Sequence, residues 1–387
     1  MIRKAQRALL QFVIFLVLLS FVIFLNRPQS KKTFAWNKIR YQTTSAALPE
    51  ARGICHGLEK SSKPALIVSR VAADGDSKWL VVLEKKFHLC IYTADAPTDK
   101  KSVHLQVPAN RGHEAMAYLT FLIDNYENIP AAGVVFVHGA RWAWHNDAPD
   151  YDNAGLLSAL NVSNALAPSG YHNLRCDWSI SSCVPSSPPQ GSLETSLQAV
   201  LNPFDSRTVS DAALPRALAV LFGGNDYAST KGGGGVLLGR TVGVRTQCCA
   251  QFAVARENLW QHSRDEYVAL RQWLLDGSDD INSDKHLQSS NAAPRDDRVA
   301  GKILSYVWHI LFMKQSESNA ENPFSGGYGG VDLERLNTLA CPSAEECYCR
   351  LYGRCGLEGC TSPGACRGQY QLPKDMRLPD DWAATHS

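Results

Sequence analysis

The 387-residue sequence has almost no charge imbalance, and this limits the partners that it can bind. Thirty-nine Lys and Arg residues oppose 37 Asp and Glu residues, which leaves a formal net charge of +2 at pH 7. No basic run is dense enough to follow a phosphate backbone, so we expect no nucleic-acid partner. The chain also lacks a G-x-S-x-G elbow, and its glycine run at Gly232 lacks the Lys-Ser/Thr ending of a phosphate loop.

Only one apolar run is long enough to cross a membrane. Residues 8–25 are apolar apart from Gln11 and Ser20, and 18 helical residues span about 27 Å, which matches a thin bilayer. A buried helix would carry a polar face, and no small-residue cleavage site follows as it would after a signal peptide. We therefore predict a tail over 1–7 and a membrane anchor over 8–25. Basic residues flank both ends, so charge does not orient the anchor.

Cysteine indicates which side of the membrane the rest of the chain occupies. The chain has 12 cysteines, and a cluster of them lies between Cys341 and Cys366. That cluster contains no histidine and no paired C-x-x-C, so it favours disulfides over zinc. Disulfides persist in oxidising compartments, and the sequon Asn161-Val162-Ser163 agrees with such a location. We predict a single-pass type II glycoprotein of the Golgi or ER membrane, with its C-terminal part in the lumen.

The pairing of the cysteines is open, because a cluster of this size allows many connectivities. We expect Cys176 to pair with Cys183. We also expect one of Cys248 or Cys249 to pair with Cys90 or Cys55. These pairings are two of the connectivities that the sequence allows.

Hydrophobic patterns predict the fold class. Short apolar strands over 65–69, 89–92 and 134–137 alternate with helices over 79–86 and 115–126, which indicates an α/β fold with a mostly parallel sheet sandwiched by helices. Further helices are expected over 191–200, 215–222, 263–275 and 300–313, a strand over 249–254, and a polar loop over 276–298. The predicted organisation is a stem over 26–63, an α/β domain over 64–324 and a small disulfide-rich knob over 325–387.

Polar side chains follow two of these strands, where the active sites of open α/β sheets lie. Arginines would bind an anion, tryptophans would stack on a sugar ring or a base, and histidine or glutamate would act as acid or base. The alternatives are that the tryptophans fill the core and that Arg111 and Glu114 only cap a helix. The catalytic residues predicted here are Glu114, His138 and His145, and the substrate-binding residues are Asp76, Arg111, Arg141, Trp142 and Trp144.

Two D-x-D pairs occur, Asp74/Asp76 and Asp150/Asp152. Carboxylate oxygens suit Mg²⁺ or Mn²⁺, and such an ion would hold a diphosphate. Pairs of this kind also arise by chance. We take Asp150 and Asp152 as the predicted metal ligands.

Several motifs resemble those of a fungal family labelled domain of unknown function 3431. They are Asn110–Ala115, Val135–Arg141, Gly170–Cys176, Cys248–Val254 and Tyr306–Phe312. The resemblance extends over about 65–313. It implies membership of the family and no particular activity, because the family has no established one.

The order of these motifs is more distantly similar to GT-A-type glycosyltransferases. This resemblance implies a GT-A fold, a nucleotide-sugar donor, a glycan or protein acceptor, and substrate-binding roles for Gln251 and His309. One departure is that the strand over 134–137 leads into His138-Gly139-Ala140-Arg141 instead of D-x-D. A lumenal glycosyltransferase is therefore the leading hypothesis. The alternatives are a non-catalytic protein that binds glycan or protein, and a metal-dependent hydrolase using His138, His145 and Asp147.

Overall fold

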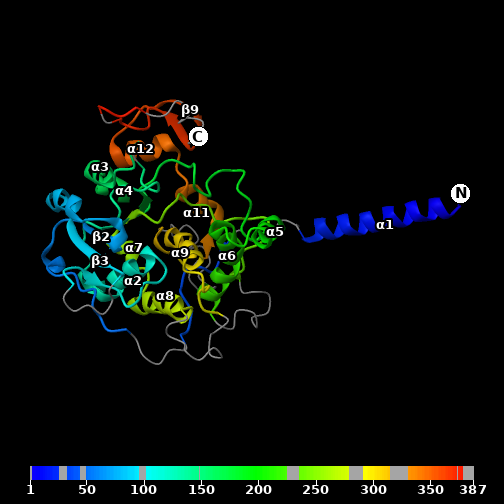
Figure 1. Cartoon of the computed structure of the whole chain (residues 1–387), viewed down its shortest axis with the longest axis horizontal. Helices are drawn as coiled ribbons and strands as arrows, with labels where there is room; N and C mark the ends of the chain where they lie inside the picture. Colours follow the sequence, from blue (N-terminus) through cyan, green and yellow to red (C-terminus); the bar gives the residue numbers. More distant parts are fainter. Residues whose placement is uncertain are drawn as a thin grey trace, which may run out of the picture.

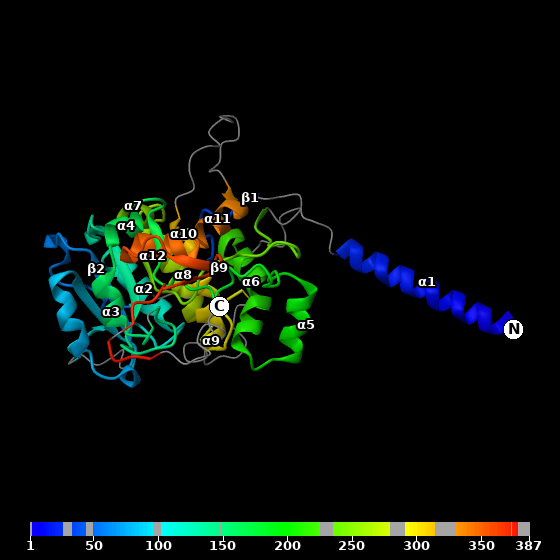
Figure 2. The same ribbon diagram turned by 90° about the horizontal axis from the view of Figure 1, so that it is seen from above.

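The computed structural model consists of a long N-terminal helix and one α/β domain (Figures 1 and 2). It describes residues 2–25, 33–43, 49–95, 102–147, 149–224, 235–278, 291–313, 330–372 and 374–377. The glycine run from Gly232 to Gly234, most of the predicted polar loop over 276–298, and the predicted boundary at 324 lie outside the described residues.

Helix α1 (Ile2–Leu25) confirms the predicted apolar span. Its segment Ala5–Phe24 is long and apolar enough to cross a membrane, and none of that segment is buried against the rest of the chain. A helix with these properties is either a membrane anchor or a signal sequence.

The central sheet has six strands in the order β4-β3-β2-β5-β7-β6. Strands β2, β3, β4 and β5 run parallel, while β7 runs antiparallel to its neighbours β5 and β6. The mostly parallel sheet is therefore confirmed. Strands β2, β3, β5 and β6 end, and β7 begins, at one edge that we call the strand-end edge. The strands are β2 (Ala65–Arg70), β3 (His88–Thr93), β4 (Leu105–Gln106), β5 (Val134–His138), β6 (Tyr171–Asn173) and β7 (Phe252–Val254).

Helices cover both faces of this sheet (Figure 1). Alternate residues of β5 show why: Val134 and Phe136 join one apolar core, and Val135 and Val137 join the other. Because successive strand residues point to opposite faces, an uninterrupted apolar strand must be covered twice. Helices α2 (Glu114–Asp124) and α8 (Arg264–Asp276) lie on one side, and α3 (Asn153–Ala159), α4 (Val162–Leu166) and α12 (Ala344–Tyr352) on the other.

Most predicted elements form, with changes at their ends. The segment over 79–86 is a 3₁₀ helix, the predicted helix over 300–313 divides into α9 and α10, and Ser263 and Glu266 form the expected capping box of α8. The remaining elements are β1 (Thr33–Phe34), η1 (Leu58–Lys60), η2 (Ala72–Asp74), η3 (Lys78–Lys85), η4 (Tyr126–Asn128), α5 (Leu193–Leu201), α6 (Ser206–Gly223), α7 (Arg256–Leu259), α9 (Asp297–Ser305), α10 (Trp308–Phe312), β8 (Val331–Asp332), α11 (Leu333–Ala340), β9 (Glu358–Ser362) and β10 (Ala365–Arg367).

The predicted stem over 26–63 is not a spacer throughout. Strand β1 pairs with β8, and Phe34, Trp36 and Tyr41 are buried in the core. The Trp36 Nε1 donates to the carbonyl of Val236 at 2.8 Å, and its ring stacks on Phe34 with centroids 4.2 Å apart. The free energy gained by burying these aromatic rings favours packing the segment on the domain over leaving it in solvent. Only residues 26–32, outside the described residues, separate α1 from the domain.

The disulfide-rich segment is not a separate knob either. Leu336 of α11 belongs to the first core, and Tyr348 and Leu351 of α12 belong to the second. Disulfides are confirmed, but every predicted pairing is wrong: Cys176 and Cys183 each pair with a cysteine of the C-terminal cluster, and Cys248 pairs with its neighbour Cys249. The pairs are Cys55–Cys90, Cys176–Cys347, Cys183–Cys341, Cys248–Cys249, Cys349–Cys355 and Cys360–Cys366.

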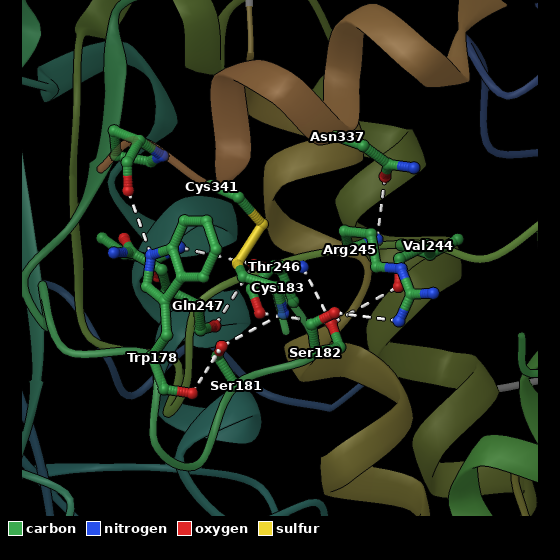
Figure 3. Close-up of a disulfide and its surroundings, with 12 residues drawn as sticks. Trp178, Ser181, Ser182, Cys183, Val244, Arg245, Thr246, Gln247, Asn337 and Cys341 are labelled. Carbon is green, nitrogen blue, oxygen red and sulfur yellow. Dashed lines mark hydrogen bonds between the residues drawn. A yellow bond between two sulfur atoms is a disulfide. The ribbon is translucent and has the colours of Figure 1, made fainter. Parts of the chain in front are cut away.

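The Cys183–Cys341 disulfide fixes three segments that are distant in sequence (Figure 3). The Arg245 guanidinium donates to the carbonyl of Ser182 at 3.0 Å, and the Arg245 amide donates to Asn337 Oδ1 at 2.8 Å. The loop after β6, the segment before β7 and the end of α11 thus form one unit. This unit fixes the path of the chain just before β7.

We predict that the two classes of disulfide contribute unequally to stability. Cys176–Cys347 closes a separation of 171 residues, whereas Cys349–Cys355 closes one of 6. Loop-closure entropy gives about 5 kcal/mol for the long loop and about 2 kcal/mol for the short one. The variant Cys176→Ala/Cys347→Ala should therefore lose roughly twice as much unfolding free energy in urea as Cys349→Ala/Cys355→Ala. Equal losses would contradict this assignment of the pairs.

Candidate functional site

His138 ends β5 and is held in one orientation at the strand-end edge. Its Nε2 lies 2.7 Å from the carbonyl oxygen of Cys249, and its backbone amide donates to Gln251 Oε1 at 3.1 Å. A carbonyl oxygen only accepts, so Nε2 carries the hydrogen. In the neutral ring the lone pair is then on Nδ1, which makes Nδ1 the basic atom.

Glu114 and His145 surround that basic atom. Glu114 is the first residue of α2, and its Oε2 lies 3.9 Å from His138 Nδ1. The rings of His138 and His145 have centroids 4.1 Å apart. A carboxylate at this position faces any proton that Nδ1 takes up. We call Glu114, His138 and His145 the histidine cluster.

His145 does not suit the predicted role of general base. Burial, then the nearby His138 and Arg175, lower the pKa of His145 to about 2. Its Nε2 is buried without a hydrogen-bond partner. An imidazole with such a pKa stays neutral and is a weak base near neutral pH. The geometry therefore favours His138, assisted by Glu114, as the base of the cluster.

Gln251 connects the end of β5 to the loop that follows it. Besides accepting from the His138 amide, its Oε1 accepts from Asn153 Nδ2 at 3.2 Å, and its Nε2 donates to Asn146 Oδ1 at 2.9 Å. Asn146 in turn donates to the carbonyl of Arg141 at 3.0 Å. All three amides are buried. The structure therefore gives Gln251 a positioning role, in place of the substrate contact that the resemblance implies.

The backbone before Gln251 has an unusual shape. Adjacent Cys248 and Cys249 form a disulfide, and Cys249 and Ala250 have φ of 139° and 55°. Positive φ is costly for residues with a Cβ and concentrates at functional sites. This shape prevents β7 from starting before Phe252, and it directs the Cys249 carbonyl at His138. The expected strand over 249–254 is shorter for the same reason.

Arg141 and Asp152 pair with each other, which changes both predicted roles. Arg141 Nε donates to Asp152 Oδ1 at 2.9 Å, and its second nitrogen donates to Asp152 Oδ2 at 3.1 Å. Asp152 also caps α3 by accepting from the Ala154 amide at 3.0 Å. Both carboxylate oxygens are thus occupied. An ion at Asp152 would compete with Arg141 for the carboxylate, and a diphosphate would compete with Asp152 for Arg141.

Trp142 and Trp144 are exposed, so the alternative that they fill the core is wrong. Their exposed fractions are 56% and 65%. The Arg141 guanidinium carbon lies 4.6 Å from the centroid of the Trp142 ring, and this cation–π contact fixes the orientation of the ring. Exposed aromatic rings of this size are surfaces on which sugar rings or bases stack.

A cavity of about 400 Å³ lies between the loop after β5 and the C-terminal segment. Its wall combines carboxylates, phenols and a guanidinium, and a pocket of this size suits one small polar ligand. The polar lining includes Asp150, Asp152, Tyr348, Tyr352 and Arg354. Trp142 adjoins it through an antiparallel bridge to Asp152.

Arg111 is a structural residue, which corrects its prediction as a diphosphate ligand. Its guanidinium is buried and donates to Asp297 Oδ1 at 3.0 Å and to the carbonyl of Arg295 at 2.9 Å. Further bonds reach the carbonyls of Leu274 and Gly277 at the end of α8. Arg111 therefore joins the end of α8 to the start of α9. No guanidinium nitrogen remains for a ligand.

Asp76 and His309 do not join the histidine cluster. Asp76 is exposed, and its Oδ1 accepts from the Lys78 amide at 3.0 Å. His309 is fully buried in α10, and neither ring nitrogen has a partner. Burial lowers the pKa of His309 to about 3. The substrate-binding role implied for His309 does not fit a side chain without access to solvent.

Arg70 is a cation at the strand-end edge that sequence reasoning missed. It ends β2, and a Cβ added to Gly139 would lie 2.3 Å from the Arg70 Cβ. Only glycine permits this close approach of the β2 and β5 ends. The Arg70 guanidinium donates to the carbonyl of Gly75 at 2.6 Å. In the sequence, the glycine of the His138-Gly139 pair was the one sign that another strand end approaches β5 closely.

The geometry also disfavours the metal-dependent hydrolase. Asp147 is buried, accepts from the Tyr348 hydroxyl at 2.9 Å, and also accepts from the amide of Cys176. Within the described ranges, one group of three potential metal ligands is close enough, Cys55, His88 and Cys90. Its two cysteines form a disulfide and supply no thiolate.

Sequence reasoning did not predict a group of buried charged residues near the histidine cluster. Arg175 and Asp177 are buried 3.5 Å apart, and Arg175 also donates to the carbonyl of Trp144 at 3.0 Å. Burial raises the pKa of Asp147, which lies beside this pair. These groups fix the loop that presents Trp144.

Comparison with known proteins places the chain in a family without a described activity. Residues 66–350 match the family described as "Protein of unknown function (DUF3431)". The match covers well over half of the sequence, so the chain belongs to this family. It extends to Cys347 and thus includes both disulfides that tie α11 and α12 to the loop after β6. No curated protein and no solved structure matches the chain.

We predict that His309→Leu reduces the loss of stability in acid. The unfolded chain binds a proton at His309 below its ordinary pKa of about 6.5, whereas the folded chain does not until pH is about 3. The free energy of unfolding is therefore highest above about pH 6.5, the pKa of His309 in the unfolded chain. Below that pH it falls by about 1.4 kcal/mol per pH unit. Leucine has similar volume and no titrating group.

Urea unfolding at pH 7 and pH 5 measures this difference. Wild type should lose about 2 kcal/mol more than His309→Leu between these two pH values. The control Ile310→Val changes a neighbouring core residue and should destabilise equally at both. An unchanged slope in His309→Leu would contradict a neutral, buried His309.

Proposed function

We propose that this protein is a membrane-anchored, lumenal enzyme of the secretory pathway that transfers a sugar from a nucleotide sugar to a glycan or protein acceptor. The observation that carries the proposal is the histidine cluster beside two exposed tryptophans at the strand-end edge. A base with a fixed tautomer and flat aromatic surfaces are what sugar transfer requires. Anchor, lumenal side and activity are all parts of this proposal, as is the Golgi or ER location.

The proposed step uses His138 as the base. An acceptor hydroxyl gives its proton to His138 Nδ1, and its oxygen attacks the anomeric carbon. The bond from that carbon to the diphosphate breaks, and the nucleoside diphosphate leaves with the electron pair. Glu114 stabilises the imidazolium through the 3.9 Å contact. Arg70, which ends β2 at the same edge, would supply positive charge to the leaving diphosphate, in the role first predicted for Arg111 and Arg141.

The sugar itself would lie on Trp142 and Trp144, with the adjoining cavity accepting further residues of the glycan. That cavity offers Asp150, Tyr352 and Arg354 to hydroxyl groups. Because Arg141 already occupies the Asp152 carboxylate, we expect transfer without a divalent cation.

A non-catalytic glycan-binding protein is the second candidate. The observation that favours it is the pairing of Arg141 with Asp152, which engages a cation first predicted to bind the diphosphate. The same tryptophans and cavity would then bind glycan without transfer. Truncation after Phe324 cannot separate the two candidates, because α11 and α12 belong to the cores.

We predict that a nucleotide sugar stabilises the full chain in nanodiscs, both in the presence of Mn²⁺ and in the presence of a chelator. A ligand at 100 times its dissociation constant adds about 2.7 kcal/mol, so thermal unfolding should shift by several degrees. Trp142→Ala/Trp144→Ala should abolish the shift. Glu114→Gln should keep the thermal shift but lower the release of nucleoside diphosphate in the presence of an acceptor by about 100-fold.

Trp260→Ala is the matched control for loss of an exposed tryptophan, since Trp260 follows α7 at the opposite edge of the sheet. It should bind like wild type. A shift with oligosaccharides alone, without diphosphate release, would replace the enzyme by the glycan-binding protein. No shift with any nucleotide sugar or glycan would contradict both candidates.

We further predict one N-glycan at Asn161 when the full chain is made in a eukaryotic cell. Asn161 is exposed at the start of α4, and its Oδ1 accepts from the Asn164 amide at 3.0 Å. Ser163→Ala removes the sequon and leaves that helix cap intact. Endoglycosidase should change the mobility of wild type and not of Ser163→Ala.

A second reporter makes this test of topology decisive. Lys60 is exposed, and Lys60→Asn creates the sequon Asn-Ser-Ser at 60–62. In the Ser163→Ala background it should restore one glycan. If neither site carries glycan, the domain does not lie in the lumen.

A further inference from the structure

Helix α5 presents an apolar stripe that the rest of the described chain leaves uncovered. Leu197, Val200, Leu201 and Phe204 have exposed fractions of 63%, 77%, 76% and 90%. Leu197, Val200 and Leu201 are spaced three and four residues apart along one side of the helix, and Phe204 lies in the turn that follows it. The opposite side of α5 packs on α6, where Thr195 is buried.

The stripe lacks the features of a solvated helix face. Residues 195–204 contain no charged side chain. Isolated exposed apolar residues are normal on a protein surface, but a contiguous group indicates a contact surface. Short amphipathic helices with such a stripe lie in the interface of a bilayer.

The chain holds this domain close to a membrane. Residues 26–32 connect α1 to β1, and their full extension is about 25 Å. A domain of this size is roughly 50 Å across. One face of the domain must therefore lie against the bilayer that α1 crosses. In Figures 1 and 2, α5 lies at the edge of the domain nearest α1.

We propose that the α5 stripe is a second membrane contact, which inserts into the lipid interface and fixes how the domain sits on the bilayer. The occupant is lipid, because the anchor already brings lipid within reach and the stripe offers no charge to a polar partner. Phe204, the most exposed of the four, would insert deepest. This inference rests on α1 as an anchor and does not depend on sugar transfer.

Photo-crosslinking of the full chain in nanodiscs tests this contact. One chain per disc is reconstituted in phosphatidylcholine that carries a diazirine in its acyl chain, and lipid adducts are mapped by mass spectrometry. We expect adducts on the peptide 193–204 as well as on α1. Val200→Asp/Phe204→Asp should reduce the adducts on 193–204 at least fivefold and leave those on α1 unchanged.

The control is Val81→Asp/Val82→Asp on η3, which replaces two valines of comparable exposure, 58% and 64%. It should leave the adducts on 193–204 as in wild type. The proposal is overturned if 193–204 carries no adducts while α1 does, the result expected if a second copy or a soluble protein covers α5. It is equally overturned if the Asp pair on α5 leaves the adducts unchanged.

Discussion

The site depends on the buried amide of Gln251 more than on any other single group. This amide fixes the end of β5, Asn146 and Asn153 at once, through bonds of 3.1, 2.9 and 3.2 Å. Inside a protein an amide that lost these partners would carry the full cost of desolvation. The loop that carries both tryptophans therefore has one arrangement, and the orientation of His138 follows from the same network.

The C-terminal segment is the second constraint. Two long-range disulfides join α11 and α12 to the loop after β6, and the Tyr348 hydroxyl donates to Asp147 beneath the loop after β5. One wall of the cavity consequently comes from residues 348–371. A segment that looks like an appended knob in the sequence is part of the site.

Charged side chains at this edge are mostly used to build the structure. Arg111 joins two helices, Arg141 is paired with Asp152, and Arg175 lies beside Asp177. A buried or partly buried charge needs a partner, so its partners occupy the positions that a ligand would take. The groups left to act are His138 with Glu114 and the two exposed tryptophans. Arg70 ends β2 at the same edge, and its guanidinium donates to the carbonyl of Gly75.

The sequence by itself determined the α/β class, the strands, the apolar helix and the presence of disulfides, because hydrophobic periodicity and cysteine count are local or additive properties. It also placed His138 at the carboxyl end of a strand, where the candidate site lies. Tertiary structure alone decided that Arg111 is structural, that Cys176 pairs with Cys347, and how the His138 ring is oriented. Each depends on a partner more than 100 residues away: Asp297, α12 and the Cys249 carbonyl. A sequence shows which groups are present, but the fold decides which of them meet.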